Sequence, residues 1–136
     1  MYTFTKYPAL ILLLAIAFAA CEKTEIDNRR QFRGTWDVEE YSHKLGYSYY
    51  QARISLEEFS EERILIENFY GAGLEVTAIV TGSKMFIPKQ TIGIFEVDGY
   101  GAFSDNYITM SYVVHTTLSE NQVISDTLEA WYTKRF

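Results

Sequence analysis

The 136-residue sequence contains a single cysteine, only two histidines and fewer basic than acidic residues. One cysteine excludes both an intrachain disulfide and a cysteine-based zinc site. The 12 basic against 18 acidic residues give a net charge of −6. Because phosphate binding needs clustered Lys and Arg, this balance argues against a nucleic-acid partner. Aromatic residues, in contrast, make up 16% of the chain and include 11 tyrosines, which indicates a folded rather than a disordered protein.

The first 20 residues have the organisation of an export signal. Residues 1–7 carry one positive charge, on Lys6, and an uncharged, mostly aliphatic run from Pro8 to Ala20 follows. A membrane-spanning helix needs about 20 apolar residues, so this run is too short to be a permanent anchor. The sequence therefore predicts a signal peptide over 1–20, whose removal leaves one domain's worth of chain. The alternative is an ordinary secretory signal followed by an unrelated cysteine.

The segment Phe18-Ala-Ala-Cys21 resembles the lipobox of bacterial lipoproteins. The resemblance implies a thioether-linked diacylglyceride on Cys21 and cleavage just before it. Two or three acyl chains would hold the protein firmly on a membrane. Glu22, rather than Asp, follows the cysteine, and in some Gram-negative lipoproteins this is compatible with the outer membrane, facing the periplasm or the cell surface. We therefore expect a lipidated tether over 21–31 and a membrane as partner.

From Gly34 onward the hydropathy pattern has a period of two, as along Leu74–Thr81, which is typical of strands. A single helical turn is expected over Asn28–Phe32, capped by Asp27 or Asn28, and no helix after it. Between turn-rich clusters the pattern predicts eight strands, at about Thr35–His43, Tyr47–Glu57, Arg63–Tyr70, Leu74–Thr81, Lys84–Pro88, Thr91–Phe103, Tyr107–Thr117 and Ile124–Arg135.

Short loops between these runs favour antiparallel hairpins, and the sheet must close on itself or pack against a second sheet. We expect an all-β, eight-stranded antiparallel up-and-down barrel, with a β-sandwich as the alternative. The run Thr91–Phe103 is either one strand with a bulge or Gly kink, or two strands around Asp98-Gly99. Pro88 is expected at a strand end or edge.

One face of the alternation supplies the residues expected to point inward. Nearly all of them are large, which favours a filled barrel with at most a modest pocket. They are Val38, Ile54, Leu56, Ile64, Ile66, Val76, Val80, Ile94, Ile108, Met110, Tyr112 and Leu128.

The segment Gly34-Thr-Trp36, preceded by a helical turn and followed by eight strand runs, resembles the opening of lipocalins and related calycin barrels. The chain as a whole is similar to short lipocalin-like lipoproteins of Gram-negative bacteria, whose function is mostly unassigned. The resemblance implies a lipocalin-like barrel over 32–136 with Trp36 at its closed end. It also implies a cation–π contact of Arg135, or Lys134, with Trp36.

The tyrosines Tyr47, Tyr49, Tyr50 and Tyr100 are the candidate ligand-binding residues, because tyrosine rings stack on sugars or line a ligand mouth. The alternative is that tyrosine merely fills cross-strand pairs. A hydrolase would need His43 or His115 beside a serine and a carboxylate, and no nucleophile-elbow motif surrounds any serine.

Adjacent acidic residues on a strand point to opposite faces, so they cannot act as a catalytic pair. No segment has the spacing of a calcium loop, and we expect neither a metal nor a cofactor. The sequence thus predicts a non-catalytic, lipid-anchored envelope protein that binds a small apolar or sugar ligand or an envelope protein. The alternatives are a solid barrel that acts as a structural or interaction module and, last, a hydrolase.

Overall fold

The computed structural model describes residues 26–136, so the expected signal peptide, Cys21 and the start of the tether lie outside the described residues. One 3-10 turn, η1, is followed by eight strands. These elements are η1 (Asn28–Gln31), β1 (Gly34–Ser42), β2 (Gly46–Leu56), β3 (Arg63–Phe69), β4 (Leu74–Thr81), β5 (Lys84–Ile92), β6 (Phe95–Ser104), β7 (Tyr107–Ser119) and β8 (Gln122–Lys134).

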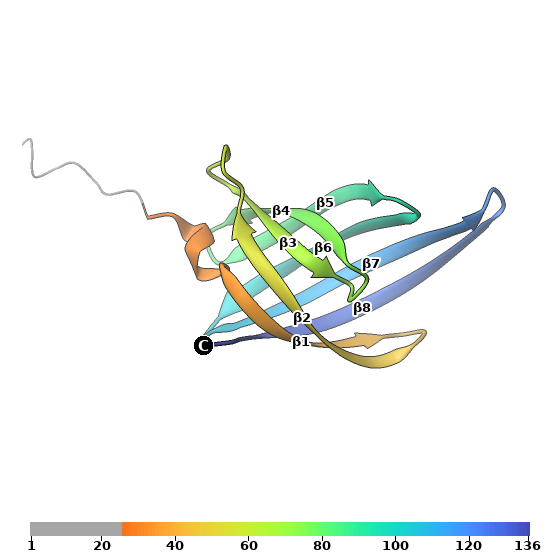
Figure 1. The fold of residues 1–136 in the computed structure, drawn as a ribbon, viewed down its shortest axis with the longest axis horizontal. Coiled ribbons are helices and arrows are strands. Elements are labelled where there is room, and N and C mark those ends of the chain that lie inside the picture. Colours follow the sequence, from red (N-terminus) through yellow and green to blue (C-terminus); the bar gives the residue numbers. More distant parts are fainter. Residues whose placement is uncertain (1–25) are drawn as a thin grey trace, which may run out of the picture.

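Each strand pairs antiparallel with the next, and β8 returns to pair with β1, which closes the barrel (Figure 1). The expected eight-stranded up-and-down barrel is therefore confirmed, and the sandwich alternative is wrong. We call the end that carries η1 and the β2–β3, β4–β5 and β6–β7 connections the closed end. The end with the other four hairpin turns is called the mouth.

The β5–β6 hairpin departs from the sequence prediction. The turn lies at Gly93 and Ile94, so β5 extends to Ile92 and Asp98-Gly99 falls inside β6. Gly99 is needed there because a Cβ would lie 2.4 Å from the Cβ of Tyr112 on β7. The prediction that Pro88 lies at a strand end or edge is wrong, because it lies inside β5. The β5–β6 register shifts between Ile87 and Gln90, so Pro88 lies in a bulge, a position that tolerates the missing N–H of proline.

The period-two alternation buries one face of β1, β4 and the first part of β7, as expected, and of the closed-end part of β8. The prediction that Ile94 points inward is wrong, because this residue lies in the β5–β6 turn and is 52% exposed. Leu56, at the end of β2, is only partly buried. The other ten form the core together with aromatic residues at both ends of the barrel.

The closed end is plugged by Trp36, which is completely buried. Its indole Nε1 donates a hydrogen bond to the Phe32 carbonyl (2.8 Å), and its ring meets Phe103 edge-on. The cation over Trp36 is Lys134, whose Nζ lies 5.5 Å from the ring centroid. The prediction that Arg135 makes this contact is wrong. Its side chain is exposed, and its backbone N–H donates a hydrogen bond to the Thr35 carbonyl.

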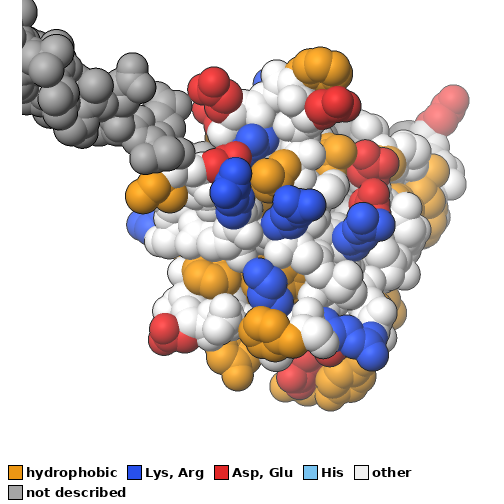
Figure 2. Space-filling model, turned by 60° about the vertical axis from the view of Figure 1, so that its left-hand side comes forward, with side chains coloured by type: hydrophobic (Ala, Val, Ile, Leu, Met, Phe, Trp, Pro, Cys, Tyr) orange, Lys and Arg blue, Asp and Glu red, His pale blue; other side chains and the backbone are white. Residues whose placement is uncertain are grey.

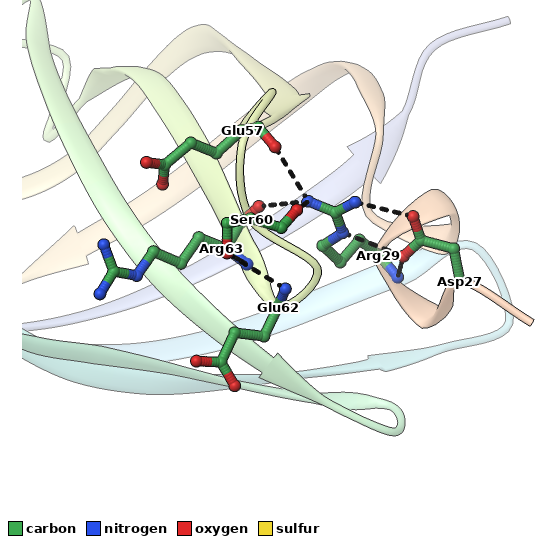
Figure 3. Close-up of polar contacts among 6 residues, drawn as sticks. All are labelled: Asp27, Arg29, Glu57, Ser60, Glu62 and Arg63. Atoms are coloured by element: carbon green, nitrogen blue, oxygen red, sulfur yellow. Dashed lines mark hydrogen bonds and ion pairs between the residues drawn. The ribbon is translucent and has the colours of Figure 1, made fainter.

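Arg29 ties η1 to the β2–β3 connection at the closed end (Figure 3). Its Nη1 donates to the carbonyl oxygens of Glu57 (3.1 Å), Ser60 (2.5 Å) and Arg63 (3.0 Å). The side chain is 11% exposed, so these bonds satisfy a guanidinium that is largely removed from water. Together with the hydrogen bond from the Val80 N–H on β4 to the Glu62 carbonyl (2.7 Å), Arg29 therefore fixes this loop.

Asp27 caps the 3-10 turn, as expected, by accepting from the N–H of Arg29. It also forms an ion pair with the Arg29 guanidinium at 2.9 Å. The hydrogen bond from Arg29 lowers the pKa of Asp27. The segment from Asp27 onward is thus part of the folded unit, and the expected tether over 21–31 ends earlier than Gln31.

Candidate functional site

A hydrogen-bonded cluster of polar side chains lies inside the barrel, centred on Glu40 of β1. Glu40 is 1% exposed, and its Oε2 accepts hydrogen bonds from the hydroxyls of Tyr50 (2.5 Å) and Tyr112. The cluster therefore links β1 to β2 and to β7 across the interior. Tyr50 lies with the apolar face of its strand, as expected, but its hydroxyl is used inside the barrel.

The β3–β4 turn covers this cluster from the mouth. A Cβ on Gly71 would lie 3.1 Å from the Tyr50 ring, so the backbone of the turn rests directly on that ring. The rings of Phe69 and Tyr112 lie 4.5 Å apart, and Tyr70 meets Tyr112 edge-on at 6.2 Å. These contacts leave the Glu40 carboxyl shielded from solvent.

A second carboxyl, Asp126 of β8, lies nearer the mouth and is 6% exposed. Its Oδ2 accepts from the hydroxyls of Ser42 and Tyr70 (3.4 Å). The Ser42 Oγ in turn accepts from the backbone N–H groups of Lys44 (3.2 Å) and Leu45 (2.9 Å) in the β1–β2 turn. Asp126 thereby holds the turns around the mouth together.

Two buried polar atoms in this region have no hydrogen-bond partner among the described residues. They are Oδ1 of Asp126 and the hydroxyl of Tyr132. Burial raises the pKa of Glu40, and the nearby Asp126 carboxyl acts in the same direction, whereas the two tyrosine hydrogen bonds oppose the rise. Burial likewise raises the pKa of Tyr132, followed by the effect of the Glu40 charge.

The largest fully buried side chains fill the barrel from one end to the other. Trp36 and Phe32 occupy the closed end, Tyr112 with Phe69 the region beneath the mouth, and Tyr132 and Ile54 are also completely buried. Several hollows of the described part of the chain lie on its outer surface. The interior cluster can therefore cross-link strands and hold protons, but large side chains occupy the space in which a ligand would lie.

Three of the four candidate tyrosines lie on the outside of the barrel. Tyr47, Tyr49 and Tyr100 are 62%, 73% and 66% exposed. Tyr50 is separated from them by the barrel wall, so the four do not form one site. Trp131, which sequence reasoning missed, joins the outer group at 39% exposed.

The strand registers place these outer residues in neighbouring rows that run around the barrel. In one row Tyr49, Glu39, Trp131 and Thr109 are successive cross-strand neighbours. In the next row, toward the mouth, the neighbours are Tyr47, Tyr41, Glu129, Ser111, Tyr100 and Phe86.

Three surface hollows lie along these rows and share residues. One lies between Tyr49 and Trp131, the second between Trp131 and Tyr100, and the third between Tyr100 and Phe86. Trp131 lines the first two, and Tyr100 and Ser111 line the last two. We call these three hollows, which follow one another around the outside of the barrel, the outer groove.

The outer groove has aromatic walls and a polar, mostly acidic lining. Four carboxyl groups line it, those of Asp37, Glu39, Asp98 and Glu129, against the single ammonium of Lys89. Glu129 and Asp98 make no side-chain hydrogen bond or ion pair within residues 26–136. The groove therefore offers flat apolar rings beside free hydrogen-bond acceptors.

The two histidines lie apart from both features. His43 follows β1 at the mouth, where its ring meets Tyr41 edge-on at 5.4 Å. His115 on β7 contacts the Ser125 hydroxyl through Nδ1 at 2.6 Å, on the outer face. Within the described part of the chain no carboxylate is hydrogen-bonded to His115, although Glu96 is its cross-strand neighbour on β6.

Residues 26–136 contain no group of three or more His, Cys, Asp or Glu side chains arranged to hold a metal ion. Among the same residues, no helix has the length and apolar character needed to cross a bilayer.

Comparison with known proteins supports the fold alone. No protein-family model matches the chain, and no curated protein matches it. A solved structure of a redesigned β-barrel aligns with a TM-score of 0.53 and 14% sequence identity, over 84% of this chain and 100% of that one. At this identity the likeness concerns the barrel architecture and carries no function.

Proposed function

We propose that this protein is a lipid-anchored, non-catalytic binding module of the bacterial envelope that works through the outside of a solid barrel. The observation that carries the proposal is the filled interior, in which Trp36, Tyr132 and Tyr112 occupy the space that a carrier would leave for its ligand. An eight-stranded barrel has room for packed side chains or for one small ligand. Of these two, the packing favours the first.

The anchor rests on the lipobox-like segment that ends at Cys21. Ile26, Asp27 and Glu61 line one hollow at the closed end, so the described part of the chain begins at that end. Unpaired arginines such as Arg30 and Arg33 lie at the same end, and Figure 2 shows Lys and Arg side chains on this face interspersed with Asp and Glu side chains. An anchor at the closed end would leave the mouth directed away from the membrane.

Outer-membrane sorting and membership among lipocalin-like lipoproteins belong to the same proposal. Support comes from Glu22 after the cysteine and from the 3-10 turn, Gly34-Thr-Trp36 and Lys134 arranged around the closed end. The proposed function involves no catalytic step and requires no cofactor.

Two measurements test the proposal. Cys21→Ser is expected to release the protein from the membrane fraction, and globomycin is expected to cause the uncleaved precursor to accumulate. Native mass spectrometry of the protein purified from its own envelope is expected to show the mass of the lipidated polypeptide alone. A stoichiometric small molecule protected inside the barrel would instead show that the protein is a carrier.

A further inference from the structure

We propose that the β7–β8 hairpin is a homodimerisation element, in which the free edge of β8 pairs with the same edge of a second copy of this chain. The hairpin extends farther than the other hairpins at the mouth (Figure 1). β1 pairs with β8 only as far as Leu128, and the next backbone bond runs from the His43 N–H to the Thr127 carbonyl. Within the described part of the chain, residues 122–126 of β8 therefore have β7 as their strand partner on one side and none on the other. The inference goes beyond the proposed function and does not depend on the lipid anchor.

The backbone of this edge carries unpaired hydrogen-bonding groups. Along an antiparallel strand, alternate residues direct both their N–H and their C=O group to the same neighbouring strand. Because the Thr127 carbonyl accepts from His43, the N–H and C=O groups of Ser125 and Val123 point to that side as well. These four groups have no hydrogen-bond partner among residues 26–136. Such an edge is a template for an added strand.

The side chains along the edge leave it open to pairing. Proteins commonly protect an edge strand with lysine, proline or a bulge. Residues 122–126 read Gln-Val-Ile-Ser-Asp, without lysine or proline, and the β7–β8 register is regular from Val123 to Asp126. Val123 and Ile124 are 58% and 37% exposed, and both are residue types that favour strands. The single charge, on Asp126, is buried and accepts a hydrogen bond from the Ser42 hydroxyl.

A second copy fits this edge because the edge is complementary to itself. A two-fold axis at Ile124 would place Val123 of each copy opposite Ser125 of the other, so that all four free groups of each edge are paired. In this register Ile124 lies opposite its counterpart, and Gln122 lies opposite Asp126, which brings an amide to a carboxylate without facing like charges. Moving the axis to either neighbouring residue would require the β7–β8 turn or a carbonyl that already accepts from His43.

Charges beyond the paired residues also favour a second copy. In the same register, position 121 of one copy lies opposite Thr127 of the other, to which His43 is bonded. The hairpin tip, which carries Glu120, therefore comes beside the β1–β2 turn of the other copy, which carries Lys44, and both residues are exposed. An unrelated strand could form the same backbone bonds, but the two-fold axis brings Glu120 to Lys44 twice in one dimer.

The test traps the dimer by a disulfide in intact cells that make the full chain. In the proposed register the two Cα atoms at position 124 lie about 4.5 Å apart, within the range that a disulfide bridges. With copper phenanthroline as the oxidant, Ile124→Cys is expected to give at least ten times more covalent dimer on a non-reducing gel than the wild-type chain. The wild-type chain controls for cross-links through Cys21, its only cysteine. Ile94→Cys is the matched control, because Ile94 is an exposed residue at the mouth on the β7 side of the hairpin, and it is expected to stay at the wild-type level.

A second measurement tests the register. Chains with Val123→Cys and with Ser125→Cys, carrying tags of different size, are made in the same cells. These two positions face each other in the proposed pair, whereas two copies of position 123 are diagonal neighbours roughly 7–8 Å apart, which is too far for an unstrained disulfide. The mixed dimer is therefore expected to exceed either homodimer at least fivefold.

Absence of the Ile124→Cys dimer, or equal cross-linking of Ile94→Cys, overturns the inference. Homodimers of the position-123 or position-125 variants that match the mixed dimer overturn the proposed register and the symmetric pairing with it. A disulfide adduct of Ile124→Cys with a different protein, without a dimer, assigns the edge to another partner and likewise overturns pairing between copies.

Discussion

The contact between Lys134 and Trp36 gives the sharpest test of how the barrel is closed. The Lys134 Nζ lies 5.5 Å from the centre of a ring that is completely buried. Cation–π contacts stabilise by about 0.5–1 kcal/mol at exposed sites and about 2 kcal/mol or more when desolvated. Because Lys134 is half-buried, we expect about 1 kcal/mol for this pair.

The experiment is a double-mutant cycle that combines Lys134→Met with Trp36→Leu. Methionine keeps the apolar stem of the lysine and removes its charge, so the cycle isolates the contact with the ring. Arg135→Met is the matched control, because Arg135 is the next residue and is exposed. Urea unfolding is followed by far-ultraviolet circular dichroism, since the Trp36 substitution changes the fluorescence signal.

We expect a coupling free energy of about 1 kcal/mol between Lys134 and Trp36, and additivity within about 0.5 kcal/mol between Arg135 and Trp36. Trp36→Leu alone should cost several kcal/mol, a large share of the 5–15 kcal/mol typical of a domain. Coupling that appears with Arg135 and not with Lys134 would refute the assignment. Additivity in both cycles would show that the cation contributes nothing to closure.

Three further predictions follow from buried or crowded positions. Arg29→Met should lower the free energy of unfolding by about 2–4 kcal/mol, because three loop carbonyls lose a charged donor. In the same urea melts, Arg30→Met at an exposed position should change the free energy of unfolding by no more than about 0.5 kcal/mol. The pKa of Glu40 is raised above its usual value of 4.5 in the folded state, so the stability that the protonated carboxyl contributes is present below pH 4.5 and is lost as the pH rises. Glu40→Gln should therefore gain stability relative to wild type between pH 4 and about pH 7. A difference in stability between the two proteins that stays constant across melts in that range would contradict the raised pKa. Gly99→Ala should cost about 2 kcal/mol or more of stability, because its Cβ would meet the Tyr112 Cβ and the Ser111 carbonyl. Gly101→Ala should cost less, because a flexible methionine side chain is among its nearest neighbours. Equal decreases in melting temperature for the two variants would argue against this account.

The strands themselves could be predicted because the period-two pattern is a local property of the chain. The same pattern also contained signals that the sequence reasoning did not use. Along β8 the buried positions Leu128, Ala130 and Tyr132 continue to Lys134, so parity alone places Lys134 on the inward side and Arg135 on the outward side. Glu40 likewise shares the inward face of β1 with Trp36 and Val38, although a buried carboxyl there was not expected.

The position of the β5–β6 turn could not be predicted from the period-two pattern. Asp98-Gly99 is a strong turn signal in isolation, yet Gly99 lies in mid-strand because Tyr112 leaves no room for a Cβ. The chain turns instead at Gly93, whose φ is +60°. A glycine serves either purpose, and only the neighbouring strand decides between a turn and a close approach.

The sequence by itself determined the all-β class, the eight strands and the capped turn before β1, because each follows from alternation or capping between residues close in the chain. The position of Trp36 at the closed end was instead an implication of the resemblance to lipocalins. Only the tertiary structure decided which hydroxyls reach Glu40 and which aromatic residues line the outer groove. Tyr112 reaches Glu40 across the barrel, and Tyr49 is brought near Trp131 through Glu39. Such neighbours depend on the register of every hairpin and on the pairing of β1 with β8. Register and closure are non-local, because a shift of one residue in any pair would turn each of these side chains to the other face.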